Sequence, residues 1–100
     1  MTDPRDDWRT DDADDLFAAL LSLETPDEVA RFMRDLCTYR ELEEMTARWK
    51  AVRLLEESLP YREISAETGM STATVTRVSQ WLQHGMGGYR IALDRRTSTT

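Results

Sequence analysis

Residues 61–80 read YREISAETGMSTATVTRVSQ, and this stretch decides the fold. Ile64 is the inward-facing residue expected of a short first helix. Gly69 stands where the following turn requires a positive φ, which glycine adopts at no steric cost. Val75 and Val78, three residues apart, supply the inward pair of a second helix and leave its other face free. The spacing therefore predicts a helix-turn-helix unit.

Three further residues fit the same unit. Ser65 is the small residue expected where the second helix crosses the first, and Met70 is the hydrophobic residue of the turn. Ser71 is a natural N-cap for the second helix, because its hydroxyl can accept a hydrogen bond from a first-turn N–H group.

The outward face of the second helix carries short polar side chains and no acid. These residues are Thr72, Ala73, Thr76, Arg77 and Gln80. Hydroxyls, a methyl, a guanidinium and an amide are the groups that read base edges in the major groove. Arg62 is placed to reach a phosphate or a guanine edge, and Ser71 joins this set at a helix N-terminus, where the dipole favours phosphate. We predict a surface that binds double-stranded DNA, the alternative being an ordinary helical corner with a polar outer face.

Charge is unevenly distributed along the chain. The net charge of the 100 residues is −6, yet residues 1–28 hold ten acids against two arginines, so the remainder is slightly positive. Residues 61–100 contain five arginines against three acids. This bias permits phosphate contacts near the predicted unit but does not establish them.

Helices are also expected before this unit. Thr25, Pro26 and Glu28 are typical of a helix start, as N-cap, first-turn proline and capping-box glutamate. Apolar spacing predicts another helix at about 13–22 and a long one at about 40–58. The expected buried sides are Leu16, Phe17, Leu20 and Leu21; then Val29, Phe32, Met33 and Leu36; then Leu42, Met45, Trp49, Val52, Leu55 and Leu59.

These apolar stripes exceed what one core of this size covers, which predicts a homodimer. The fold class expected is all-α with five to six helices. Its organisation is a disordered acidic arm at 1–12, a helical domain at 13–93 and a disordered tail at 94–100. Within the domain, Tyr89, Ile91 and Leu93 are expected to fold a short C-terminal segment onto the core.

No catalytic or metal-binding pattern is present. The single His84 and the single Cys37 lie far apart in sequence, and the acidic run at 11–15 lacks the glycine and closing glutamate of a calcium loop. We therefore expect no enzyme, no metal and no cofactor. The sequence has a single cysteine, and it contains neither a run of 18 apolar residues nor the pattern of a secretory signal. These features predict a cytoplasmic protein without a membrane partner.

The chain resembles the Trp repressor superfamily of helix-turn-helix regulators. The likeness lies in residues 25–28, 64–69 and 74–77. It is closer to the Trp-repressor-related YerC/YecD regulators, which share residues 48–50, 61–64, 71–78 and 87–89, and it covers about 13–93. The resemblance implies an intertwined homodimer whose N-terminal helices interlock, with two reading heads one DNA turn apart. It also implies a cytoplasmic bacterial transcription regulator.

The same resemblance implies a possible ligand pocket. In tryptophan-binding members, two arginines sandwich the indole. They match Arg77 and, if one residue is deleted before Pro60, Arg48. The residue after the recognition-helix arginine is glycine in those members and Val78 here, so its side chain is expected to fill that space. DNA binding is therefore expected without tryptophan, and any small-molecule effector is unknown.

Two functions stay open at this point. The first is a sequence-specific repressor that acts as a dimer on a near-palindromic operator. The alternative is a protein-binding adaptor that uses a helix-turn-helix fold without DNA readout, which the overall acidity favours. Salt-sensitive affinity for DNA separates the two.

Overall fold

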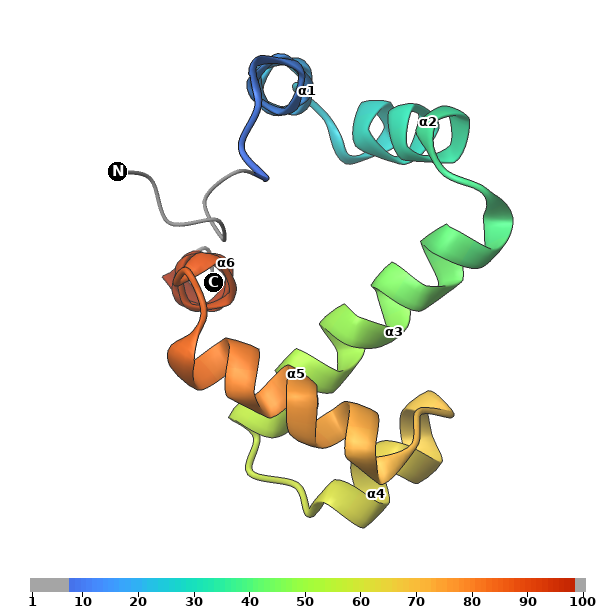
Figure 1. The fold of residues 1–100 in the computed structure, drawn as a ribbon, viewed down its shortest axis with the longest axis vertical. Coiled ribbons are helices and arrows are strands. Elements are labelled where there is room, and N and C mark those ends of the chain that lie inside the picture. Colours follow the sequence, from blue (N-terminus) through green and yellow to red (C-terminus); the bar gives the residue numbers. More distant parts are fainter. Residues whose placement is uncertain (1–7, 99–100) are drawn as a thin grey trace. The chain divides into compact units, whose positions relative to one another are not determined.

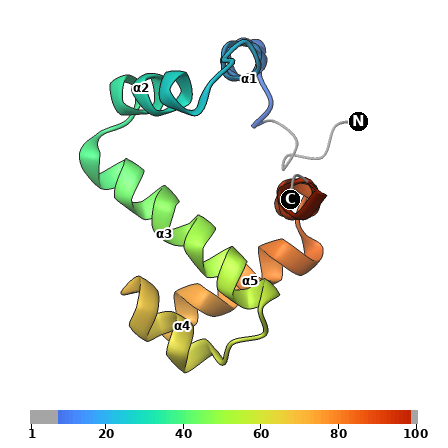
Figure 2. The same ribbon diagram turned by 180° about the vertical axis from the view of Figure 1, so that it is seen from behind.

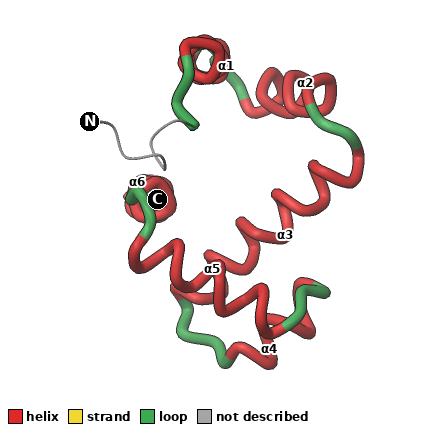
Figure 3. The backbone as a smooth tube through the Cα atoms, in the orientation of Figure 1, coloured by secondary structure: helices red, strands yellow, loops and turns green. Residues whose placement is uncertain are grey.

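The computed structural model describes residues 8–98, which form six α-helices and no strand (Figures 1 and 3). The helices are α1 (Asp11–Leu21), α2 (Pro26–Leu36), α3 (Tyr39–Glu56), α4 (Tyr61–Thr68), α5 (Thr72–His84) and α6 (Gly88–Ser98). The described part of the chain divides into two compact units, one that ends at Tyr39 and one that begins at Arg40. The expected all-α class with five to six helices is confirmed.

Side-chain caps start the helices of the first unit. The hydroxyl of Thr25 accepts a hydrogen bond from the N–H of Glu28 over 3.1 Å, as the sequence predicts for α2. The carboxylate of Glu28 accepts in turn from the N–H of Glu24 over 2.8 Å, one residue before the N-cap. Thr10 caps α1 in the same way, by accepting from the N–H of Ala13. The helix therefore begins at Asp11, inside the segment expected to be a disordered arm.

The apolar sides of α1 and α2 are not buried, contrary to the expectation from their spacing. Neither helix contains a buried residue. Phe17 and Leu21 are 39% and 88% exposed, and Val29 and Leu36 are 38% and 50% exposed. Two helices of eleven residues are too small to enclose a core of their own, which is the physical reason for the difference.

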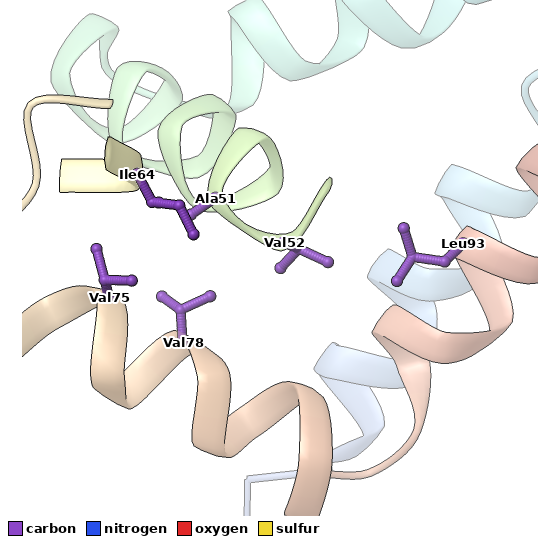
Figure 4. Packing of buried hydrophobic residues seen from close by; sticks show 6 residues of the cluster. All are labelled: Ala51, Val52, Ile64, Val75, Val78 and Leu93. Atoms are coloured by element: carbon purple, nitrogen blue, oxygen red, sulfur yellow. The ribbon is translucent and has the colours of Figure 1, made fainter. Parts of the chain in front are cut away.

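The second unit contains the core. Figure 4 shows Val75 and Val78 pointing from α5 toward Ile64 of α4 and Ala51 of α3, and all four side chains have no exposed surface. Val52 of α3 is equally buried. Figures 1 and 2 agree in placing α4 and α5 beside the second half of α3. The long helix thus serves as the platform for the helix-turn-helix unit.

The C-terminal segment is longer and more regular than expected. It forms α6 through Ser98, so a helix occupies residues 94–98 of the expected disordered tail. Tyr89 packs against the core and Leu93 is 5% exposed, but Ile91 is 52% exposed. Residues four apart share a helix face, whereas a residue midway between them points away, so Ile91 cannot pack with the other two. Residues 1–7 and 99–100 of the expected arm and tail lie outside the described residues.

Candidate nucleic-acid interface

The turn between α4 and α5 is held by glycine geometry and by side-chain hydrogen bonds. Gly69 ends α4 in the left-handed region, with φ 77° and ψ 1°, and its N–H donates to the carbonyl of Ser65. The hydroxyl of Ser65 donates to the carbonyl of Met70 over 2.5 Å. The hydroxyl of Thr68 donates to the carbonyl of Ile64 and accepts from the N–H of Met70. These bonds leave the turn little freedom, so α5 leaves α4 in one direction.

Ser71 starts α5. Its hydroxyl oxygen accepts from the N–H of Thr74 over 3.1 Å and lies 3.0 Å from the hydroxyl of the same residue. The first-turn N–H groups of a helix have no partner within the helix, and here they stand at the positive end of the α5 dipole. Ser71 is exposed, but its hydroxyl is already used by the cap.

The two sides of α5 differ as the sequence predicts. Val75, Val78 and Ser79 are buried against the core. The predicted reading residues are all exposed: Thr72, Ala73, Thr76, Arg77 and Gln80. At 100° per residue these positions fall within one continuous face of the helix. Their relative placement is therefore set by the backbone of a single helix.

Some exposed side chains of this face form hydrogen bonds within the described part of the protein, and others do not. The hydroxyl of Thr76 donates to the carbonyl of Thr72 over 3.0 Å, and Arg77 donates to the hydroxyl of Thr74 over 3.2 Å. Arg62, exposed in the first turn of α4, and Gln80 have no hydrogen-bond or ion-pair partner within residues 8–98. Both side chains thus have donors available for an external acceptor.

Lys50 connects the long helix to the end of α4. Its ammonium group donates to the carbonyl of Glu67 over 3.3 Å and lies 3.8 Å from the carboxylate of the same residue. This pairing partly neutralises one of the two acids of α4. It also satisfies a last-turn carbonyl, which a helix by itself leaves without a donor.

A cavity of about 560 Å³ lies between the first half of α3 and the turn that joins α4 to α5. Arg48 and Arg77 both line it, so the structure brings together the two arginines that the resemblance matched. The other lining residues are Glu43, Glu44, Ala47, Thr68, Gly69, Met70 and Thr74. Two glutamates therefore line the same cavity as the two arginines.

The match to known proteins covers this whole architecture. The family model described as Trp repressor protein matches residues 11–97. The chain belongs to the Trp repressor family. This membership suggests a helix-turn-helix regulator.

Relatives of the Trp repressor family support the assignment. The uncharacterized protein YerC of Bacillus subtilis is 42% identical over 94 residues, which cover 94% of this chain and 90% of that protein. A TrpR-like protein from Eubacterium eligens has a TM-score of 0.86 at 35% identity, over 92% of this chain and 95% of its own. A candidate Trp repressor from Staphylococcus aureus has the same TM-score at 34% identity, over 96% of both chains.

Val78 does not line the cavity, which differs from its expected place in the pocket. It has no exposed surface and packs with Ile64 and Val75 in the core (Figure 4). The resemblance to the tryptophan-binding members of the Trp repressor family implies a glycine at this position. Here an isopropyl group occupies the interior, and the cavity is lined by Arg48 and Arg77 without Val78.

Some features of the site had no signal in the sequence. Glu43 and Glu44 line the cavity because this part of α3 lies near the turn between α4 and α5. The spacing of residues within α3 does not reveal which part of the helix meets the turn. Tyr61 donates a hydrogen bond to the buried hydroxyl of Ser79, 18 residues away.

No helix in the described part of the chain is both long and apolar enough to cross a membrane.

Proposed function

We propose that this chain is a sequence-specific DNA-binding transcriptional repressor of the cytoplasm that inserts α5 into the major groove. The observation that carries the proposal is the division of α5. On its buried side Val75 and Val78 pack in the core, and its opposite side presents polar residues without an acid. A helix in this setting can be docked in a groove about 12 Å wide without disturbing the core.

The proposed roles follow from side-chain chemistry. Thr72, Thr76 and Gln80 offer short polar groups to base edges, and Ala73 offers a methyl for thymine. Arg62 and Arg77 supply the cationic contacts. Ser71 contributes by capping α5, so that first-turn N–H groups are directed at a phosphate.

The proposed regulator is a homodimer. The apolar sides of α1 and α2 have no buried residue within one chain, and a second copy is the simplest cover for them. A twofold dimer requires a near-palindromic operator with half-sites about 34 Å apart. Sedimentation at micromolar concentration should give twice the chain mass of 11.6 kDa. A species of 11.6 kDa alone would contradict the dimer.

DNA affinity is the decisive test of the function. Gel shifts with random-sequence duplex should show basal binding that weakens as salt rises, because each neutralised phosphate releases counterions. Sites selected from a random pool should then bind at least about 1,000-fold more tightly than that basal level. The absence of any salt-sensitive affinity would refute the proposal.

A protein-binding adaptor is the second candidate, and the net charge of −6 is the observation that favours it. An adaptor with this fold would show no affinity for duplex DNA at low salt. The same gel shifts therefore decide between the two functions.

The cavity between Arg48 and Arg77 is the proposed place for a small-molecule effector, if the protein has one. Such a ligand would contact α3, the turn and α5 at once, and its binding would therefore affect the position of α5 relative to α3. Because Val78 fills the adjacent interior, we propose that tryptophan is not required for DNA binding.

A further inference from the structure

We propose that Tyr61 and Ser79 are positioning residues that set the spacing between Arg62 and the reading face of α5, and so influence sequence preference. This inference rests on the proposed DNA-binding function. It starts from a contact between two residues that do not line the cavity. The phenol of Tyr61, the first residue of α4, donates a hydrogen bond to the hydroxyl of Ser79 over 2.7 Å.

Ser79 is an unusual residue for its place. Its side chain is 4% exposed, and it is the one buried polar residue among residues 8–96, where burial is described. Its oxygen accepts a second hydrogen bond, from the amide of Gln83 over 3.1 Å. A buried hydroxyl without partners is strongly disfavoured, and these two bonds supply the partners of Ser79.

The contact joins the two backbone segments that carry the reading side chains. Tyr61 immediately precedes Arg62 on α4, whereas Ser79 lies between Thr76 and Gln80 on α5. No other hydrogen bond connects a side chain of α4 with a side chain of α5 in the part of the chain that the structure describes.

The apolar core cannot replace this contact. Ile64 packs against Val75 and Val78, but dispersion contacts are non-directional and tolerate small sliding of one helix on another. A hydroxyl pair has a narrow optimum in distance and angle. The pair Tyr61–Ser79 is therefore a directional restraint on the angle between α4 and α5 in addition to the hydrogen bonds of the turn.

The test compares base preferences of matched variants. Wild-type protein first selects sites from a pool of random duplexes. Tyr61→Phe, Ser79→Ala and the double variant are then measured on the selected site, on the site with each base pair substituted, and on random duplex. Tyr39→Phe is the control, because it removes the hydroxyl of an exposed tyrosine outside the reading unit. Melting temperatures are recorded for all five proteins.

We expect Tyr61→Phe and Ser79→Ala to reduce discrimination between selected and substituted sites by about tenfold, the size of one displaced base contact. Affinity for random duplex should stay within about twofold, since phosphate contacts are sequence-independent. The double variant should be no worse than the worse single variant, because both break one bond. Tyr39→Phe should behave as wild type.

Each contrary result has its own meaning. Wild-type base preferences in Tyr61→Phe, with or without a lower melting temperature, would make the contact purely structural and overturn this inference alone. If Ser79→Ala does not fold, Tyr61→Phe still decides, because it keeps the ring and removes only the hydroxyl. Failure of the wild type to select any site would overturn the proposed function and this inference together.

Discussion

The guanidinium of Arg90 on α6 donates two parallel hydrogen bonds to the carboxylate of Glu56 at the end of α3, over 2.8 and 3.1 Å. Both side chains are about half exposed, at 47% and 45%. The fork geometry fixes the two helices more specifically than a single ion pair would. Asp94, one turn further along α6, adds a contact of 3.4 Å to the same guanidinium.

This pair predicts a pH-dependent contribution to stability. Hydrogen bonding to Arg90 lowers the pKa of Glu56 below its ordinary value. The unfolded chain therefore binds this proton more readily, so the stabilisation is present above the ordinary glutamate pKa of about 4.3 and is lost as the pH falls below it. The Tm difference between wild type and Arg90→Met should be largest near pH 7 and should shrink as the pH falls below about 4.3. Glu56→Gln should follow the same course, and a difference that does not shrink at low pH would contradict the assignment.

Two glycines should respond differently to alanine. At Gly69, with φ 77°, an added Cβ meets nothing within 4 Å, so the cost is backbone strain alone, about 1–2 kcal/mol. Gly69→Asn should cost less, because asparagine tolerates the left-handed region better. At Gly85 a Cβ would lie 2.4 Å from the carbonyl oxygen of Trp81, which is backbone and cannot move aside cheaply. Urea unfolding should therefore rank Gly85→Ala as more destabilising than Gly69→Ala, and the reverse order would be contrary to this geometry.

Arg62 is predicted to contact either a guanine or a phosphate, and two substitutions separate these roles. Arg62→Ala should weaken binding to the selected operator by about 1–3 kcal/mol if a guanine is read, and should relax preference at one base pair. Arg62→Lys keeps the charge but not the planar fork. If Arg62→Ala and Arg62→Lys both lose the preference at one base pair, Arg62 reads a guanine. Equal weakening on every sequence, restored by lysine, indicates a phosphate contact.

Tryptophan should neither bind nor promote DNA binding. The resemblance places a glycine, and so the space for the indole, where this chain has Val78. Val78 has no exposed surface, and opening that space would strain a packed interior by about 1–3 kcal/mol. Calorimetry should detect no tryptophan binding at tens of micromolar, and operator affinity should be unchanged by it. Binding in that range together with tighter operator affinity would refute the prediction.

Val78 should also be needed for the stability of the reading helix. Val78→Gly removes a fully buried side chain and adds a flexible residue to α5, with a combined cost of about 3 kcal/mol. Ala73→Gly, at an exposed position of the same helix, measures the backbone part alone, about 1 kcal/mol. The difference between the two variants in urea unfolding reports the packing of Val78. Equal losses would mean that the isopropyl group contributes nothing.

The sequence by itself determined the features that depend on neighbours within about four positions. Thr25 and Glu28 mark the start of α2, while Gly69 and Ser71 mark the turn and the start of α5, because capping and positive φ are local requirements. The period of the helix likewise separated buried Val75 from the exposed polar face of α5.

Only the tertiary structure decided how helices distant in sequence meet. It placed Glu43 and Glu44 beside the two arginines of the cavity, Tyr61 on Ser79, and α6 on α3 through a pair 34 residues apart. It also left the apolar sides of α1 and α2 without a fully buried residue, although their spacing predicted burial. Such contacts depend on where helices cross, and the packing of the whole unit sets those crossings. The spacing of apolar side chains shows which side of a helix can be buried, but it does not specify which surface covers that side.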